Sequence, residues 1–347
     1  MNIPSHLTIL SKYSEYLPES YDNFPHGRYV SLILIRKTES ETIFRTEGSG
    51  EGLSKEIVTA GRHKDDTVNN IVPLRRVVIS KRKQTAVERR TGRELLREHG
   101  LLRIAEGSKE KNPCALNTNA PCGKCIDCML YGYAVGGGGA QKSRVMTDDA
   151  YSIAPVSQVT AKRTFNATFD NGTMRNPLTG AASTSINEDE YVLPETHFLD
   201  IETLKDVTAG ELQYVIGNIL RSSRYGAISS RLGRVRNTLV AMIFSDTELF
   251  SNLELTQHVY DILKGSDQEL PFPLSNQAIK DAIHEASNEL LKRVVGRVPV
   301  VVRDAVLEQV IDETITLYRD NEQLLTLLQA VEKEYEKAQQ KSTNSTK

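Results

Sequence analysis

All four cysteines of this 347-residue chain lie within fifteen residues, at Cys114, Cys122, Cys125 and Cys128. The spacing Cys-x7-Cys-x2-Cys-x2-Cys allows four sulfurs to converge on one tetrahedral ion, which gives a segment a fixed shape without a core of its own. Four glycines follow at residues 136–139, and we interpret them as a hinge. The pattern predicts a metal-stapled insertion that stands out from a larger core.

Structural zinc is the cofactor that this pattern favours, because a closed set of four thiolates leaves no position for water or substrate. An iron–sulfur cluster and ordinary reduced thiols stay open as alternatives. A bacterial ferredoxin run is not matched, because no cysteine follows Cys128. Residues 1–20 carry no signal-peptide pattern, so we expect a cytoplasmic protein, in which clustered cysteines favour metal over disulfides.

Charge is distributed unevenly along the chain. Residues 246–340 contain 18 acidic and 9 basic side chains, which leaves a net charge of +5 for residues 1–245 out of a total of -2. We therefore expect any polyanion to bind within the first 245 residues. No apolar run approaches the roughly 18 residues of a membrane span, so no membrane partner is expected.

The first strand is predicted at residues 28–36, whose nearly continuous apolar run is typical of a strand covered on both faces. Further strands are predicted at 42–46 and 74–80, separated by a polar loop at 57–70. A helix is predicted at 86–99, with Thr85 and Glu88 in capping-box spacing and a glycine just past its end.

That helix is basic. Arg89, Arg93 and Arg97 recur every four positions and form one stripe, and residues 75–103 contain ten basic and three acidic side chains. Phosphate binding and a solvated helix face are both compatible with this pattern.

Short strands are expected at 143–156, followed by a long hairpin at 163–195, where turn residues are too dense for a helix. A strand near 196–201, a capped helix at 209–221 and a strand at 238–244 then make a βαβ unit. Beyond residue 246 the chain reads as helical, at 249–263, 276–295 and 302–336.

A loop at residues 225–237 joins that helix to the last strand. Gly226 and Gly233 allow close approach of the backbone to a ligand, and guanidinium groups suit phosphate oxygens. The arginines of this loop and of the helix end before it are Arg221, Arg224, Arg231, Arg234 and Arg236. The pattern favours nucleic acid, and the alternative is an arginine-rich turn that pairs with the acidic C-terminal helices.

Taken in order, these pieces resemble the guide-RNA-coating backbone subunits of CRISPR Cascade complexes, specifically subtype I-D within the RAMP superfamily. The resemblance rests on the segments KRKQTAVERRTGRELLREHG, KSRVMTDDAYS, RTFNATFDNGTMRNPLTG and SSRYGAISSRLGRVRN, together with the cysteine insertion. It covers most of residues 25–245. No single motif is specific to the family. The specific feature is the order in which the motifs occur along the chain.

The resemblance implies an α+β fold, namely a modified RRM-like (ferredoxin-like) core with a zinc-stapled insertion, a thumb hairpin and a helical C-terminal portion. The core, or palm, would comprise residues 1–100, 143–162 and 196–245. The cysteine finger would occupy 101–142, the thumb 163–195, the helical portion 246–338, and a disordered tail 339–347. The aromatic motifs of ordinary RRM proteins are absent, so base stacking on the sheet is not expected.

The implied function is a non-catalytic subunit that polymerises along CRISPR RNA and presents it for pairing with target DNA in antiviral defence. Its partners would be copies of itself in a helical filament, the large subunit and the subunit that caps the 5′ end of the guide. Met174 or Leu178 would be the wedge residue of the thumb. The predicted RNA-binding residues are Lys81, Arg82, Lys83, Arg89, Arg93, Arg163, Arg221, Arg224, Gly226, Arg231, Gly233, Arg234 and Arg236.

Two other functions stay open at this stage. Related backbone subunits of type III complexes cut RNA with an acid in the thumb, where this chain carries Asp170. A zinc-bearing nucleic-acid-binding regulator is the other alternative. The seven histidines form no paired motif, and the adjacent Asp148 and Asp149 would point to opposite faces of a strand, so neither predicts a further metal site.

Overall fold

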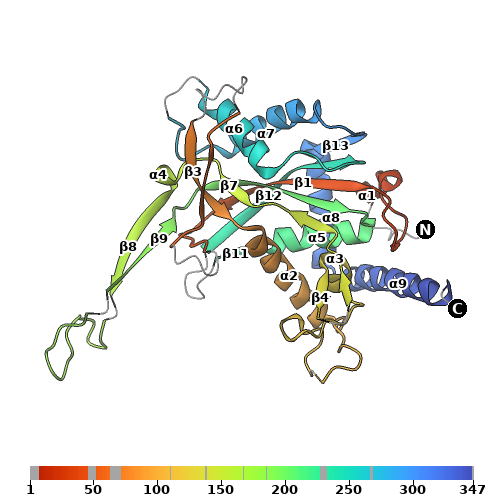
Figure 1. The fold of residues 1–347 in the computed structure, drawn as a ribbon, viewed down its shortest axis with the longest axis horizontal. Coiled ribbons are helices and arrows are strands. Elements are labelled where there is room, and N and C mark those ends of the chain that lie inside the picture. Colours follow the sequence, from red (N-terminus) through yellow and green to blue (C-terminus); the bar gives the residue numbers. More distant parts are fainter. Residues whose placement is uncertain are drawn as a thin grey trace.

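The computed structural model of the chain describes residues 8–45, 52–62, 72–109, 111–136, 139–166, 168–184, 186–226, 233–265 and 269–345. Within this part, one nine-stranded antiparallel sheet has the order β11-β12-β1-β10-β7-β3-β2, with β13 paired to β12 and β6 paired to β10 (Figure 1). Its strands are β1 (Tyr29–Thr38), β2 (Lys55–Thr59), β3 (Pro73–Ile79), β6 (Val145–Thr147), β7 (Ala150–Ser152), β10 (His197–Lys205), β11 (Arg224–Tyr225), β12 (Gly233–Ser245) and β13 (Val300–Arg303).

Two separate hairpins project from the body of the molecule. They are β4 (Tyr133–Val135) with β5 (Gly139–Gln141), and β8 (Thr160–Asn166) with β9 (Ile186–Val192). The described α-helices are α1 (Thr8–Ser11), α2 (Lys81–Glu98), α3 (Ile126–Tyr131), α4 (Val156–Val159), α5 (Ala209–Arg221), α6 (Asn252–Lys264), α7 (Asn276–Leu291), α8 (Asp304–Arg319) and α9 (Asn321–Ser345). Among the described residues, no helix is long and apolar enough to cross a membrane.

Strand β1 lies inside the sheet between β12 and β10 and is covered on both faces, as its apolar run predicts. Leu32 and Leu34 lie in one buried cluster with the apolar stripe of α5, whereas Ile33 and Ile35 lie in a second cluster with residues of α6 and α7. Figure 1 shows α6 and α7 above the sheet and α2 and α5 below it. The sheet is therefore the middle of three layers.

The predicted βαβ unit is present. Strands β10 and β12 both pair antiparallel to β1, one on each side, so they run parallel to each other and α5 connects them. Helix α5 has the predicted bounds. Its capping box is also present, because Glu211 N donates to Thr208 Oγ1 at 3.4 Å and Thr208 N donates to Glu211 Oε2 at 2.8 Å.

Helix α2 begins five residues earlier than predicted. Its first amide, Lys81 N, donates to Asp149 Oδ1 at 2.9 Å, so the cap comes from a residue 68 positions away. Thr85 instead donates from its hydroxyl to the carbonyl of Lys81, and Glu88 is completely buried. The predicted capping box is therefore wrong, although Gly100 does follow the helix end with a φ of 69°.

Other boundaries differ from the predictions as well. In the segment 42–46, Thr42 makes an isolated bridge to Val192 instead of a strand, and residue 46 lies outside the described part. The segment predicted as a polar loop at 57–70 begins within β2, which pairs with β3, and its residues 63–70 are outside the described part.

The predicted helix at 302–336 is divided into β13, α8 and α9. Asp320 causes the break between the two helices, because its Oδ1 accepts from the amides of Glu322 and Gln323 at 3.1 Å. Helix α9 continues to Ser345, whereas a disordered tail was predicted from residue 339. Gln339 Nε2 donates to the carbonyl of Gly123 at 3.2 Å. This hydrogen bond connects the last turns of α9 to the cysteine segment, residues 101–142.

Candidate nucleic-acid interface and cysteine centre

The four cysteines converge, as their spacing predicts. All four Sγ atoms lie within 4.8 Å of one another, with 3.3 Å between Cys114 and Cys128 and 3.7 Å between Cys114 and Cys125. Sulfurs around a tetrahedral zinc ion, at about 2.3 Å from it, lie about 3.8 Å apart. The donor set therefore fits a four-coordinate zinc ion.

The four thiols of the cluster influence one another's protonation. Hydrogen bonding from the other three cysteines lowers the pKa of the Cys114 thiol, while hydrogen bonding to Cys114 raises the pKa of the Cys125 and Cys128 thiols. Four sulfurs at this distance repel one another as thiolates, and a central divalent ion removes that repulsion. Cys125 N further donates to Cys122 Sγ at 3.3 Å, which is the kind of contact that orients a thiolate ligand.

Two arginines of α2 clamp the cysteine segment. Arg89 Nε and Nη2 donate to the two carboxylate oxygens of Asp127 at 2.9 and 2.8 Å, and Arg93 Nη1 donates to Asp127 Oδ2 at 2.9 Å and to Cys114 Sγ at 3.4 Å. Asp127 is completely buried. We predicted both arginines as RNA ligands, but in this structure they hold the cysteine centre against α2.

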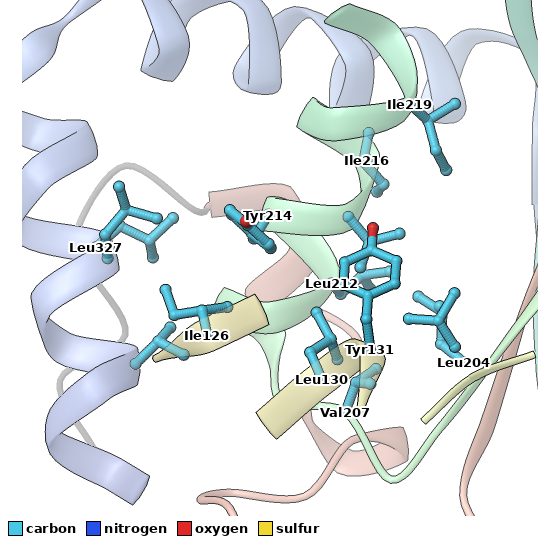
Figure 2. Close-up of a cluster of buried hydrophobic side chains, with 14 of the residues drawn as sticks. Ile126, Leu130, Tyr131, Leu204, Val207, Leu212, Tyr214, Ile216, Ile219 and Leu327 are labelled. Atoms are coloured by element: carbon cyan, nitrogen blue, oxygen red, sulfur yellow. The ribbon is translucent and has the colours of Figure 1, made fainter. Parts of the chain in front are cut away.

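The cysteine segment is not a free-standing insertion. All six residues of α3 are buried, and the cysteines themselves belong to the larger core cluster. Figure 2 shows Ile126, Leu130 and Tyr131 among residues of α5, with Leu327 of α9 opposite them. The remainder, including the β4–β5 hairpin, does project below the body in Figure 1. The sequence pattern predicted the convergence of the four sulfurs but not this packing.

A row of arginines marks the edge of the sheet at β11 and β12. Arg224 pairs with Arg234 across the two strands, and Arg234 and Arg236 alternate with the buried Val235, so all three arginines point outward. Both Arg234 Nε and Arg236 Nε contact Glu39, at 3.0 and 2.6 Å, and both side chains are about 60% exposed (59% and 63%). These ion pairs go to the end of β1 and not to the C-terminal helices.

The other residues predicted in this loop have different surroundings. Arg221 lies 5.7 Å from the centroid of the Tyr318 ring, on α8. Gly233 packs so tightly that a Cβ would lie 1.7 Å from Thr42 Oγ1, which gives this glycine a structural reason independent of any ligand. Gly226 has a φ of 130°, which favours glycine. Arg231 lies outside the described residues.

Three further predicted RNA ligands form the first turn of α2. Lys81 and Arg82 are exposed and Lys83 is half-buried. Cations at a helix N-terminus are unfavourable for the helix dipole, whereas an anion there is favourable. The carboxylate of Asp149, which accepts from Lys81 N, already places one anion at this turn.

The thumb hairpin pairs continuously from Thr160 with Val192 to Asn166 with Ile186 and extends away from the body (Figure 1). Near its base, Arg163 contacts Glu41 at 2.5 Å and lies 5.3 Å from the Tyr191 ring. At the tip, Asn176 Oδ1 accepts from Leu178 N at 2.9 Å, and the Leu178 side chain is 94% exposed. Met174, the other predicted wedge, is half-buried.

Comparison with known proteins identifies the family. A family model described as Csc2 CRISPR matches residues 16–328. The chain belongs to the Csc2 CRISPR family. This result confirms that the resemblance to CRISPR proteins identified the right family. No curated protein matches the sequence.

A solved structure supports the fold of this Csc2-family chain. The crystal structure of Csc2 from Thermofilum pendens has 19% identity and a TM-score of 0.62, covering 97% of this chain and 98% of that one. Two chains from CRISPR RNA-guided surveillance complexes, one of them pre-nicking, are 10% identical. They cover 79% and 78% of this chain and 91% and 87% of theirs, with TM-scores of 0.45 and 0.41.

Sequence reasoning missed the groups that hold the cysteine centre and the arginine row together. Glu39, Asp127 and the completely buried Arg36 were all absent from the predicted set. One signal was available, because the two acids Asp200 and Glu202 alternate with apolar residues in β10, where a buried cation partner is required. That partner is Arg36 of the neighbouring strand.

Proposed function

We propose that the chain is a backbone subunit of a type I-D CRISPR Cascade complex. It binds CRISPR RNA, polymerises along it with the other Cascade subunits, and presents it for pairing with invading DNA. The observation that carries the proposal is the outward row of Arg224, Arg234 and Arg236 in a chain of the Csc2 family. Binding without sequence preference requires backbone charge and shape, and base pairing then supplies the specificity.

The packing of the sheet supports placing the RNA at its edge. An ordinary RRM stacks bases on an open sheet face. Here the apolar side chains on both faces of β1 are buried, against α5 on one side and against α6 and α7 on the other. The edge formed by β11 and β12 and the first turn of α2 are basic surfaces that stay accessible, because Arg224, Arg234, Arg236, Lys81 and Arg82 are exposed there.

We propose a modified RRM-like (ferredoxin-like) core as the scaffold. The support is the order β12-β1-β10-β7 together with α2 and α5, which contact each other on one face of the sheet. In that arrangement α5 is the crossover of the second βαβ half. The finger, the thumb and the helices after residue 246 are then additions to this scaffold.

We propose structural zinc as the metal of the cysteine centre and the cytoplasm as the compartment of the protein. Elemental analysis of the purified chain is expected to give one zinc ion per chain, and a Cys125→Ser variant is expected to lose it. A visible absorption band with bound iron would instead indicate an iron–sulfur cluster and would contradict the zinc assignment.

Leu178 is the better candidate for the wedge residue of the thumb, because it is far more exposed than Met174. We further propose that the subunit is not a nuclease. An assay of the assembled complex with paired target tests this point. Metal-dependent cleavage that disappears in an Asp170→Ala variant would overturn it.

The nucleic acid that accompanies the protein tests the main proposal. The chain is expressed in a cell that carries a CRISPR array, purified at low salt, and its bound nucleic acid is sequenced. Repeat-derived RNA of many different spacers is the expected result. Random cellular RNA or a single duplex DNA site would contradict the proposal, the latter in favour of a regulator.

A further inference from the structure

A buried arginine lies directly behind the outward row of arginines. Arg36 of β1 is completely buried and pairs in register with Asn237 of β12, one residue beyond Arg236. Three carboxylates surround it, from Glu88, Asp200 and Glu202, all completely buried as well. Residues of this kind are rarely buried unless a network requires them.

The guanidinium group of Arg36 has two distinct sides. Its Nε and Nη2 donate to carboxylates, with 2.9 Å to Asp200 Oδ2, 2.9 Å to Glu88 Oε1 and 2.6 Å to Glu202 Oε1. Its Nη1 instead donates to Tyr225 OH at 3.0 Å and to Asn237 Oδ1 at 2.9 Å. Because the guanidinium is planar and rigid, the acids on one side fix the position of the two groups on the other.

Tyr225 and Asn237 lie at the two ends of the arginine row. Asn237 Nδ2 donates to Tyr225 OH at 2.9 Å and to the carbonyls of Ile219 and Ser222 at 2.8 and 2.9 Å, which also ties the row to the end of α5. Tyr225 is buried and its backbone pairs with Gly233. Each inward side chain is thus adjacent in sequence to an outward arginine, Arg224 or Arg236.

The charges of the cluster are consistent with a fixed anchor. Burial alone would lower the pKa of Arg36, but Tyr225 and the three carboxylates raise it well above its usual value, so the group stays charged. Burial raises the pKa of Glu88 and of Glu202, which allows these acids to share a proton and limits the repulsion between them.

We propose that Arg36, through Tyr225 and Asn237, is a positioning residue that holds Arg224, Arg234 and Arg236 in one row for phosphate binding. This inference rests on the proposed function, because it assigns a purpose to the row. It adds that binding strength depends on a cluster that never touches RNA. Preorganisation of this kind lowers the ordering cost that a flexible arginine segment would incur on binding.

The test uses Tyr225→Phe, which keeps the buried ring and removes only the hydroxyl, the group that contacts Arg36, Asn237 and Glu88. Substituting Arg36 itself leaves three buried acids without a cation and endangers folding. Tyr260→Phe is the matched control, because that ring also lies beside a buried arginine, 4.9 Å from the Arg76 guanidinium, but on α6. An Asn237→Ala variant removes the other link and is expected to act like Tyr225→Phe.

Two measurements are made on the full chain. The first, without RNA, is hydrogen exchange of the amides of Arg234 and Val235, which donate to Ser40 Oγ and to the carbonyl of Ser223. Tyr225→Phe is expected to raise their exchange rates about tenfold. The second is the affinity for CRISPR RNA at several salt concentrations. We expect a loss of about threefold to tenfold with an unchanged salt slope, because no phosphate contact is removed.

The controls separate positioning from direct contact. Arg234→Gln is expected to reduce the salt slope by about 0.7, which is the signature of a lost phosphate contact on a single strand. Wild-type exchange rates in Tyr225→Phe, or raised rates with wild-type affinity, would overturn the inference. If the wild-type chain bound no RNA, the proposed function would fail, and the exchange data alone would decide whether Arg36 positions the row.

Discussion

At the residue scale, the cysteine centre and the arginine row of this Csc2-family chain are both held by buried ion pairs. Asp127 joins the cysteine centre to α2, and Arg36 joins the arginine row to β10 and α2. Buried pairs of this kind contribute little net stability compared with apolar packing, but removal of one partner is costly. Substitution of Asp127 or Arg36 is therefore expected to have a large and measurable effect.

Asp127→Asn is expected to lower the free energy of unfolding by about 2–4 kcal/mol, because it leaves Arg89 and Arg93 facing each other without a carboxylate. Urea titration followed by circular dichroism measures the change. The matched control is Glu106→Gln, whose side chain is 83% exposed beside Lys124 and should leave the free energy of unfolding close to that of the wild type. Equal effects of the two substitutions would show that the clamp is not structural.

Gly233→Ala is expected to destabilise the chain by about 2–3 kcal/mol, because the added methyl group would overlap the side chain of Thr42. Thermal unfolding measures the loss. Gly136→Ala is the control, since a Cβ there meets nothing within 4 Å. If Gly233→Ala unfolded at the wild-type temperature and only RNA binding declined, the glycine would serve close approach to the ligand instead.

At the scale of elements, the docking of α9 is the contact that sequence patterns reveal least. The helix contacts both α3 and α5, and its Tyr335 lies edge-on to the Tyr21 ring with centroids 4.9 Å apart. Its Glu334 accepts from the backbone amide of Tyr21 at 3.3 Å. Burial, helped by repulsion from Glu211, raises the pKa of Glu334 to about 7.

A raised pKa means that the folded state binds the proton more tightly than the unfolded state. The contribution of Glu334 to the stability of the folded state is therefore complete below about pH 4.5 and is lost as the pH rises through about 7. The free energy of unfolding of Glu334→Gln, taken relative to that of the wild type, is expected to be about 1 kcal/mol higher at pH 8 than at pH 5. This value already allows for solvent screening. Thermal unfolding at both pH values measures it, with Glu322→Gln on the same helix as control. A pH-independent difference would contradict the assignment.

Elements with strong local signals were predictable from the sequence. The apolar run of β1, the capping box of α5 and the cysteine spacing all depend on residues close in the chain, and all three are confirmed. The start of α2 was missed because its cap, Asp149, is distant in sequence. Arg89 and Arg93 were assigned to RNA because their pattern on the helix is the same whether the partner is a phosphate or the buried Asp127.

At the scale of the whole molecule, the layers determine where RNA has access. Helices α6 and α7 cover the face of the sheet that an RRM leaves open, so the chain offers an edge and two projections instead of a platform (Figure 1). The first 245 residues carry the positive charge, and the helices beyond them carry the negative charge. The proposed function therefore requires RNA binding that is electrostatic, independent of sequence and concentrated at the β11–β12 edge.

The most direct measurement is the salt dependence of binding to CRISPR RNA for the wild type and for Arg234→Gln/Arg236→Gln. The wild type should bind guides of unrelated sequence equally, with an affinity that falls steeply as the salt concentration rises. In the double variant, the slope of log affinity against log salt concentration should be smaller in magnitude by about 1.4. Lys333→Gln, exposed on α9, is the matched charge control and should leave the slope unchanged. A wild-type affinity that depends on guide sequence, or a double variant with the wild-type slope, would contradict the account.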